Sequence, residues 1–442
     1  MNMIRLFSAI LLFQLFTMQT RAAFPTATEI APEMYPGWNL GNTLEPGPCS
    51  WLSDPLKYET AWQGSMTTQE IIDYVKEQGF RSVRIPCSWM VHCDQNYNID
   101  TKWMDRVQEV VDYCINDSLY VILNDHYDNG WIERSFADKT ESSVKKNCAL
   151  LGMIWRQIAT RFRNYDYHLL FAGLNEPDAA GDSSKDKEGD IDALTRYEQA
   201  FVNAVRQTGG NNSNRVLVVQ APTTNIDLAY KYDSMPVDSR SNAMMYEVHF
   251  YSPFNFSLME KDESWGTRSF YWGTGNYLEG SRYNSTWGDE TYVQNQFRMM
   301  KSKYTSKGIP VILGEFGALW RTMPSGESQE KHDASIYAWY YTVCRYAIFN
   351  GLVPFVWDTN ACQRPSMDII NRKTLKIFNQ KAYDGIMDGC ASVRWPNYTP
   401  TDISSPLSEN RCPKVIYDLS GRILPTIPEK GVFIMNGKKY CK

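Results

Sequence analysis

Residues 169–178, LLFAGLNEPD, and residues 310–319, PVILGEFGAL, share one pattern. In each, an apolar run of about strand length ends in a lone glutamate, Glu176 in the first and Glu315 in the second. A continuous apolar run bounded by turn residues is typical of a strand buried on both faces of a parallel sheet. The two glutamates would then stand at the ends of two strands, and the question is whether they share one site.

Eight apolar runs of this kind alternate with helical patterns along the chain. They cover residues 34–40, 81–86, 119–124, 169–174, 215–220, 244–250, 310–315 and 352–357. Helical patterns lie between them, such as 68–79, 101–116, 141–163 and 292–307. This alternation predicts an α/β fold with a parallel sheet, and eight units predict a closed (β/α)8 TIM barrel. A doubly wound open sheet is the alternative, but no glycine-rich phosphate-binding turn supports it.

Both ends of the chain lie outside this repeat. Residues 1–22 contain Arg5, an apolar segment and a small-residue cleavage pattern, which together predict a signal peptide. We expect the barrel domain to occupy residues 23–396. Residues 397–442 begin with a Pro- and Ser-rich linker and end in short strand patterns, which predict a small C-terminal β-rich appendage. We therefore expect a protein that is exported, and either secreted or held at the cell surface.

The composition limits the partners of this protein. The chain has 442 residues, is 43% hydrophobic and carries a formal net charge of -5, with no Lys/Arg-rich run. It can bury a large core, and nucleic acid is not expected as a partner. No segment reaches the roughly 20 apolar residues of a transmembrane helix. We expect a monomer without a membrane span.

Cysteine and histidine usage argues against a metal site. The chain has 10 Cys and 5 His, and no two cysteines form a CxxC pair. In an oxidising compartment some disulfides are plausible, although spacing does not give their connectivity. A structural zinc site is not expected. We expect no metal and no cofactor.

Polar and aromatic side chains recur where the predicted strands end. In chain order they are Arg84, His126, Asn175, Glu176, His249, Tyr251, Glu315 and Trp357. The carboxyl ends of the strands form the active-site face of such a barrel, so we expect these side chains to point into one bowl. The fourth and seventh strands lie on roughly opposite sides of it, which would let the two glutamates flank a substrate bond.

A pair of carboxyl groups is what the hydrolysis of a glycosidic bond requires. One must be protonated, to give a proton to the leaving oxygen, and the other must be ionised, to attack the anomeric carbon or to activate water. An arginine beside Glu315 would keep it ionised, and a drier setting for Glu176 would keep it protonated to higher pH. The sequence does not fix the distance between them, so retention and inversion both stay open at this point.

Six motifs in barrel order resemble glycoside hydrolase family 5, the cellulase-type retaining barrels. They read GWNLGNTLE, GFRSVRIPCSW, VILNDHYD, LNEP, EVHFYSP and VILGEFG, between about residues 35 and 360. The resemblance implies a retaining mechanism that needs no cofactor. It also implies roles for the residues at the strand ends: Glu176 as general acid/base, Glu315 as nucleophile, Asn175 on the sugar 2-hydroxyl, Arg84 and Tyr251 on Glu315, His126 and His249 along the subsite before the cleaved bond, and Trp357 as its stacking platform.

The chain also departs from the family pattern. Many members carry a second histidine where this chain has Tyr127, and one common branch has Asn-Gly after the aspartate of VWDTN. Both positions touch substrate contacts, which leaves the subfamily open. At the C-terminus, YDLSGR and KGVFIMNGKK are similar to the secretion-sorting tails of some Gram-negative proteins.

A secreted, endo-acting retaining glycosidase that cleaves β-1,4 linkages of a plant cell-wall polysaccharide is the function that the resemblance implies. Cellulose-like or mixed-linkage β-glucan is the expected substrate of this endo-β-1,4-glucanase, with xylan, xyloglucan and mannan as alternatives. The aromatic-rich loop over residues 255–288 is expected to contribute sugar contacts. A different class of function, a non-catalytic carbohydrate-binding protein on a barrel scaffold, would normally have lost Glu176 or Glu315.

Overall fold

The computed structural model describes residues 24–396 together with four short strands near the C-terminus, at 416–417, 423–424, 432–435 and 438–441. The chain divides into two compact units, Met1–Asn397 and Tyr398–Lys442. Each unit is described by itself. The predicted signal peptide lies outside the described residues.

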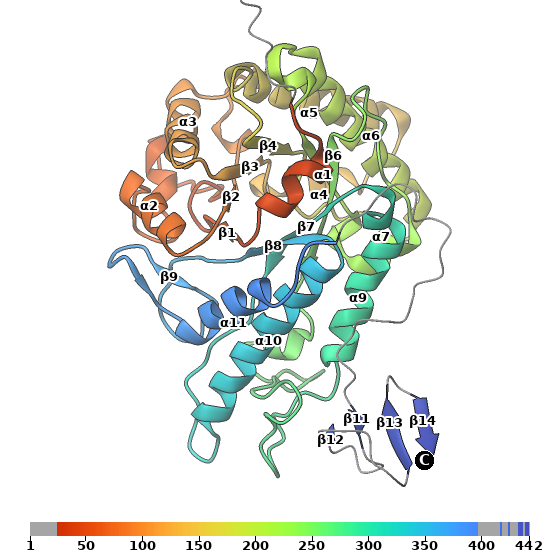
Figure 1. Cartoon of the computed structure of the whole chain (residues 1–442). Coiled ribbons are helices and arrows are strands. Elements are labelled where there is room, and N and C mark those ends of the chain that lie inside the picture. The colour runs from red at the N-terminus through yellow and green to blue at the C-terminus, as the bar shows by residue number, and fades with distance from the viewer. Residues whose placement is uncertain (1–23, 397–415, 418–422, 425–431, 436–437, 442) are drawn as a thin grey trace, which may run out of the picture. The chain divides into compact units, whose positions relative to one another are not determined.

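Eight parallel strands form a closed barrel in the order of the sequence (Figure 1). They are β1 (Gly37–Asn39), β2 (Ser82–Ile85), β3 (Tyr120–Asn124), β4 (Leu169–Ala172), β5 (Leu217–Gln220), β6 (Met244–Phe250), β7 (Val311–Phe316) and β8 (Leu352–Val356). The last strand pairs with the first, through Gly37 beside Phe355 and Trp38 beside Val356. The predicted (β/α)8 barrel is therefore confirmed, and the open doubly wound sheet is wrong because it would leave β1 and β8 unpaired.

Helices surround the barrel, and the longer ones begin at side chains that cap them. They are α1 (Ala27–Ile30), α2 (Gln69–Glu77), α3 (Thr101–Asn116), α4 (Trp131–Ser135), α5 (Glu141–Arg161), α6 (Lys187–Gln207), α7 (Ile226–Lys231), α8 (Phe254–Ser257), α9 (Glu290–Lys303), α10 (Gln329–Phe349) and α11 (Gln380–Ala391). Asp100 caps α3 by accepting from the backbone N–H groups of Lys102 and Trp103, and Ser328 caps α10 in the same way. The helix predicted over 101–116 has these bounds in the structure. No helix in the described part of the chain is long and apolar enough to cross a membrane.

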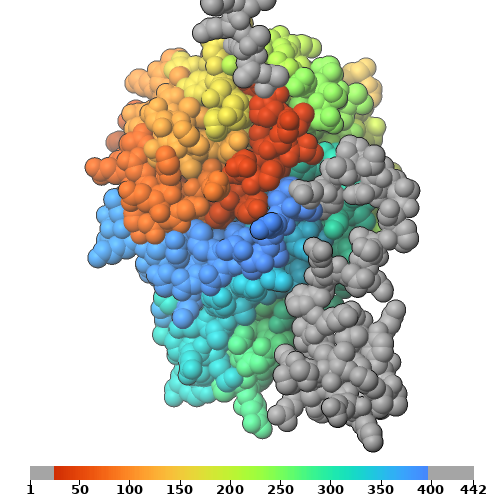
Figure 2. Space-filling view, viewed as in Figure 1, coloured from red at the N-terminus to blue at the C-terminus, as the bar shows by residue number. Residues whose placement is uncertain are grey.

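One apolar cluster fills the barrel interior. From the strands and their starts it takes Tyr120, Ile122, Leu170, Ala172, Val216, Val218, Met245, Ile312, Val353 and Phe355, and from the first turns of the chain Ala27, Ile30, Ala31 and Met34. These first turns, red in Figures 1 and 2, lie at the surface beside the blue segment that ends the unit, where Tyr35 stacks on Trp395. Since the end of the barrel beside these turns is sealed, chemistry is confined to the opposite face.

Strands β4 and β7 end differently, and this decides how their glutamates are presented. Strand β4 ends at Ala172, and its ladder does not continue past the Gly173 N–H, which donates to the Val218 carbonyl, because the Leu174 N–H donates at 2.8 Å to the Gln220 side chain and not to the backbone of β5. Glu176 therefore stands in a loop, four residues beyond the strand. Glu315 by contrast lies within β7 and pairs with His249 in the register of β6.

Two small sheets lie outside the barrel. Strands β9 (Ile370–Asn371) and β10 (Lys376–Ile377) form an antiparallel pair in the segment after β8. In the second unit, β11 (Ile416–Tyr417), β12 (Ile423–Leu424), β13 (Val432–Met435) and β14 (Lys438–Cys441) form an antiparallel sheet in the order β12-β11-β13-β14. Of the two motifs that resemble sorting tails, YDLSGR lies outside the described residues except for Tyr417, whereas KGVFIMNGKK includes β13 and the start of β14.

Candidate active site

Arg84 is the centre of the polar cluster at the carboxyl ends of the strands. Its side chain is fully buried on β2. One terminal nitrogen donates to Asn39 Oδ1 at 3.1 Å and to Glu315 Oε1 at 3.0 Å, and the other donates to Asn175 Oδ1 at 2.8 Å. Its Nε forms an ion pair with Glu247 Oε1, also at 3.0 Å. The guanidinium thus hydrogen-bonds groups from three other strands or their loops and pairs in charge with a fourth, Glu247 on β6.

Glu315 is held from both sides. Arg84 binds one carboxylate oxygen, and the Tyr251 hydroxyl donates to the other at 3.0 Å. Burial raises the pKa of Glu315 above its ordinary value, although the charges of His249 and Arg84 oppose this rise. Burial and the charge of Glu315 raise the pKa of Tyr251 well above its ordinary value, so its hydroxyl stays protonated and donates.

Glu176 lies at the rim of the same cluster. Its carboxylate bonds to His249 Nδ1 at 2.6 Å, and the Thr224 hydroxyl donates to it at 3.4 Å. Burial raises the pKa of Glu176, but the hydrogen bond and charge of His249, together with the charge of Arg84, outweigh this and leave the pKa below its ordinary value.

The expectation that Glu176 sits in the drier setting is wrong. The Glu176 side chain is 46% exposed, whereas that of Glu315 is 8% exposed. The reason is the backbone, because Glu315 belongs to a strand of the barrel wall and Glu176 to a loop beyond a strand end. A proton on Glu176 in the free protein therefore cannot be explained by burial alone.

The separation of the two carboxylates is short. One oxygen of Glu176, one oxygen of Glu315 and a ring nitrogen of His249 all lie within 4.8 Å of one another. Carboxyl groups about 5–5.5 Å apart are typical of retaining glycosidases, whereas about 6.5–9.5 Å is needed where a water must fit between them. The approach of these two oxygens is compatible with the closer of the two arrangements.

The same three side chains also offer a set of ligand atoms for a metal ion. The positive charges of Arg84 and of the His249 imidazole already lie against these oxygens. Two cations in this position oppose the binding of a third, so the cluster does not have the character of a metal site. Among the described residues, these three side chains are the group whose ligand atoms lie close enough together to be considered for a metal ion.

His126 and Trp357 form a second wall of the cluster. Their rings are stacked, with centroids 5.8 Å apart and planes 7° apart. Burial, with the charges of Arg84 and His249, lowers the pKa of His126 well below its ordinary value, which keeps the ring neutral. The structure thus brings all eight predicted residues to one face of the barrel, which leaves their chemical roles as predictions.

Sequence reasoning did not single out Glu247, although it lies inside this cluster. It is fully buried on β6, between Arg84 Nε and His249 Nε2. The signal was available, because Glu247, His249 and Tyr251 alternate in EVHFY and alternate residues of a strand face the same side. Asn39 was similarly undervalued: it bonds to Arg84 and to the backbone carbonyls of Gly314 and Val356.

The long loop after β6 has both buried and exposed aromatic residues. Phe270, Tyr271 and Trp272 are buried and hold the loop together. Trp265 is 66% exposed and lies 5.8 Å from the ring of Phe254. Phe254 lines a cavity of about 250 Å³ that also contains Glu176. The cavity places an aromatic surface on one side of the carboxylate pair.

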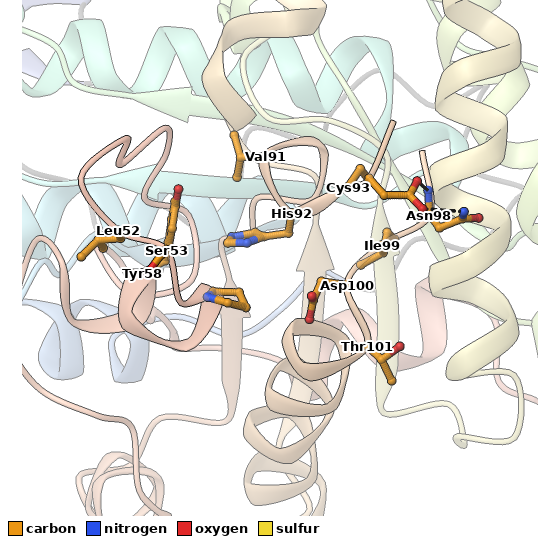
Figure 3. Close-up of a pocket in the computed structure, with 12 residues that line it drawn as sticks. Leu52, Ser53, Tyr58, Val91, His92, Cys93, Asn98, Ile99, Asp100 and Thr101 are labelled. Carbon is orange, nitrogen blue, oxygen red and sulfur yellow. Dashed lines mark hydrogen bonds between the residues drawn. The ribbon is translucent and has the colours of Figure 1, made fainter. Parts of the chain in front are cut away.

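A second cavity, of about 550 Å³, lies between the loops that follow β1 and β2 (Figure 3). It contains none of the predicted site residues. His92 in its wall stacks on Trp103 at 3.8 Å and contacts the edge of Tyr58, and burial lowers its pKa to about 3. This histidine is therefore a neutral packing residue.

Comparisons with known proteins agree on one family. The sequence model of cellulase, glycosyl hydrolase family 5, matches residues 53–363. Endoglucanase A of Clostridium longisporum is 32% identical over 389 residues, which cover 86% of this chain and 69% of that protein. The xyloglucan-specific endo-beta-1,4-glucanase of Bacteroides ovatus is 32% identical over 372 residues, which cover 82% of this chain and 70% of that protein.

Solved structures give the same result. A xyloglucan-specific beta-1,4-glucanase of family 5 from a ruminal metagenomic library, in complex with XXLG, is 45% identical, with a TM-score of 0.78 over 84% of this chain and 98% of its own. A family 5 lichenase from Caldicellulosiruptor sp. F32 is 32% identical, with a TM-score of 0.70 over 83% of this chain and 96% of its own.

Proposed function

This chain belongs to the cellulase family, glycosyl hydrolase family 5, and on that premise we propose that it is an endo-β-1,4-glucanase that cleaves its substrate with retention of configuration. The observation that carries the proposal is the pair of carboxylates, Glu176 and Glu315, within 4.8 Å of each other. This close approach supports a glycosyl-enzyme intermediate, because inverting enzymes hold their two carboxyl groups about 6.5–9.5 Å apart.

In the first step, Glu315 attacks the anomeric carbon while a proton passes through Glu176 to the leaving oxygen. Arg84 and Tyr251 aim the Glu315 oxygens and stabilise their charge before the attack. In the second step, Glu176 takes a proton from water, and that water breaks the ester bond between Glu315 and the sugar. Asn175, fixed by Arg84, binds the sugar 2-hydroxyl, and the stacked His126 and Trp357 rings line the subsite before the cleaved bond.

The substrate is a β-1,4-glucan, and we place its branched form, xyloglucan, first. The support is the 45% identity to a structure described as a xyloglucan-specific enzyme, of which this chain covers 98%. This revises the expectation from sequence, which placed cellulose-like or mixed-linkage glucan first. Mixed-linkage glucan is the second candidate, favoured by the similarity to a lichenase.

The test is reducing-end release from matched xyloglucan, mixed-linkage β-glucan, cellulose derivative, xylan and mannan. We expect turnover of xyloglucan at the highest rate, a β-anomer as the first product by NMR, and a loss of several orders of magnitude in Glu315→Ala. Binding of glucan without turnover of any polymer would favour the non-catalytic carbohydrate-binding protein. Turnover that survives in Glu315→Ala would show that another group is the nucleophile.

Export completes the proposal. Residues 1–22 would act as a signal peptide, and residues 397–442 as a linker and sorting tail beside the 23–396 catalytic domain. N-terminal sequencing of protein recovered from the medium tests the first part. Truncation after Asn397 followed by cell fractionation tests the second, since a tail without a sorting role would leave the distribution unchanged.

A further inference from the structure

Glu247 is a third carboxylate of the polar cluster, and it is buried between Arg84 and His249. Its side chain is 0% exposed and lies on β6 below His249. The Gln220 side chain donates to one of its oxygens at 2.6 Å, and the other oxygen lies 3.0 Å from Arg84 Nε and 3.2 Å from His249 Nε2. A β-carbon at Gly314 would lie 1.8 Å from that oxygen, so the neighbouring strand leaves space for this carboxylate.

His249 therefore has a carboxylate at each ring nitrogen. Nδ1 lies 2.6 Å from Glu176 and Nε2 lies 3.2 Å from Glu247. An ionised carboxylate only accepts hydrogen bonds, and a neutral imidazole carries a single N–H. Both bonds form together only if the chain Glu247–His249–Glu176 holds one proton more than a neutral histidine between two carboxylates.

The surroundings decide where that proton rests. The charge of Arg84 keeps the pKa of Glu247 below its ordinary value despite burial, so Glu247 stays ionised. Burial lowers the pKa of His249, but Glu315, Glu176 and Glu247 raise it to about 10. The neutral ring of His126 adds no charge.

We propose that Glu247 is a positioning residue that keeps His249 an imidazolium, which makes His249 the store of the proton that Glu176 delivers to the leaving oxygen. The proposal rests on the roles of Glu176 and Glu315 given above. It removes the difficulty that the more exposed glutamate has to act as an acid, because the proton waits on the buried ring beside it.

The relay returns to its starting protonation state after each turnover. As the bond from the anomeric carbon to the leaving oxygen breaks, the Nδ1–H bond of His249 breaks and the proton passes through the Glu176 carboxylate to that oxygen. His249 is then neutral, with its remaining N–H on Glu247. When water attacks the glycosyl-enzyme, its proton passes through Glu176 back to Nδ1, and no other reactant is required.

The first test is read on the wild-type protein, and a variant serves only to assign the signal. The chain has 5 His, so ¹⁵N-histidine labelling gives a small set of ring resonances, and His249→Gln identifies the ring in question. We expect both nitrogens of His249 to be protonated at pH 7 in the wild-type protein. A neutral ring with one unprotonated nitrogen at pH 7 would overturn the proposal.

The second test removes the charge of Glu247. In Glu247→Gln, the pKa of His249 falls because an anion beside a cation is lost, and the alkaline limb of the kcat/KM profile moves to lower pH by about one unit or more. Turnover of polysaccharide falls strongly, and cleavage of a dinitrophenyl glycoside, whose leaving group needs no proton, falls much less. A loss that is equal for both substrates, with the limb unmoved, would show a merely structural role.

Two variants make this test specific. Glu198→Gln changes another fully buried glutamate, which contacts the backbone of Gln220 and not His249. Burial raises the pKa of Glu198 to about 8, so this change removes little charge at pH 7, and we expect the His249 resonances to stay as in the wild type. Glu247→Asp keeps the negative charge on a shorter side chain, so we expect His249 to remain an imidazolium. Loss of the imidazolium in this variant would show that the length of the side chain, and not its charge, is what matters.

Failure of this proposal is distinguishable from failure of the proposed function. The protonation state of His249 is read without substrate, so it stands even if no glucan is turned over. Conversely, a neutral His249 in a protein that hydrolyses xyloglucan would leave the glycosidase assignment intact and remove only the relay.

Discussion

At the scale of single residues, the site is organised by charge compensation. Two cations, Arg84 and His249, lie among three carboxylates, those of Glu176, Glu247 and Glu315. Buried charges persist only where partners and hydrogen bonds offset their desolvation. With two cations and three carboxylates, the cluster carries one net negative charge and can take up one proton. Glu176 is the carboxylate of this set that is exposed to solvent.

Tyr251 gives a prediction at this scale. Tyr251→Phe removes the hydroxyl that donates to Glu315, and a lost hydrogen bond to an ionised group costs about 1.5–3 kcal/mol. The lost donor favoured the charged form, so the already raised pKa of Glu315 rises further. We therefore expect kcat/KM to fall roughly 10- to 150-fold, since about 1.4 kcal/mol is a factor of ten, and the acid limb of its pH profile to move to higher pH. An unmoved acid limb would mean that this hydroxyl does not tune Glu315.

At the scale of elements, a strand that lies beside a buried charged side chain needs a residue without a side chain at the point of contact. Strand β7 carries Gly314 directly before Glu315, and the Glu247 carboxylate of β6 occupies the space that a side chain would take. The register between β6 and β7 shifts at Val248 and His249, which is where the ladder passes these charges. A bulge of this kind near an active site re-aims a side chain.

Gly314→Ala tests this close approach. The added β-carbon would meet the Glu247 oxygen at 1.8 Å, and overpacking of a rigid core costs about 1–3 kcal/mol or more. We expect a clear fall in the free energy of unfolding together with loss of activity. Gly152→Ala is the matched control, because its nearest neighbour, the Ala204 β-carbon in α6, lies at 3.9 Å and α5 has ordinary helical geometry there.

For Gly152→Ala, we expect the free energy of unfolding to stay unchanged or to increase by about 0.5–1 kcal/mol, since alanine is favoured over glycine within a helix. Equal stability of the two variants in urea would show that β6 and β7 can move apart, which contradicts the tight packing inferred here.

At the scale of the whole molecule, buried ionisable groups set how stability depends on pH. Burial raises the pKa values of Glu45 and Glu133 to about 7 and that of Glu198 to about 8. Burial also lowers the pKa values of His92 and His332, to about 3 and about 4. The fold therefore prefers the neutral form of all five groups.

These pKa shifts predict that the folded protein is most stable at mildly acidic pH. Above the ordinary glutamate pKa the unfolded chain ionises its carboxyls while the folded one retains the protons, so stability falls as pH rises from about 4.5 to 8. Below about 6.5 the unfolded histidines take up protons that the buried rings refuse, so stability also falls toward acid. We expect the midpoint of thermal unfolding to be highest near roughly pH 5–6, and Glu198→Gln to flatten its decline toward pH 8. A midpoint that rises steadily up to pH 8 would contradict this.

The sequence by itself determined the barrel and the set of side chains at its open face. Apolar runs of strand length are local features, and the parallel closure of eight strands brings their carboxyl ends together whatever the details of packing. For the same reason Glu176 and Glu315 were predictable as a pair. Strand ends such as that of β4 were less certain, because a side chain, Gln220, takes over the hydrogen bond of the ladder.

Only the tertiary structure decided how the pair is arranged. The separation of the carboxylates, the greater exposure of Glu176 and the place of Glu247 beneath His249 depend on side chains from β2, β4, β6 and β7 packing around one point. Periodicity in the sequence assigns a residue to a face, but the proton affinity of a buried group is set by distances of a few ångströms to groups that are far away in the chain. That is why the sequence predicted a proton on the glutamate, whereas the relay proposed from the structure stores it on the histidine.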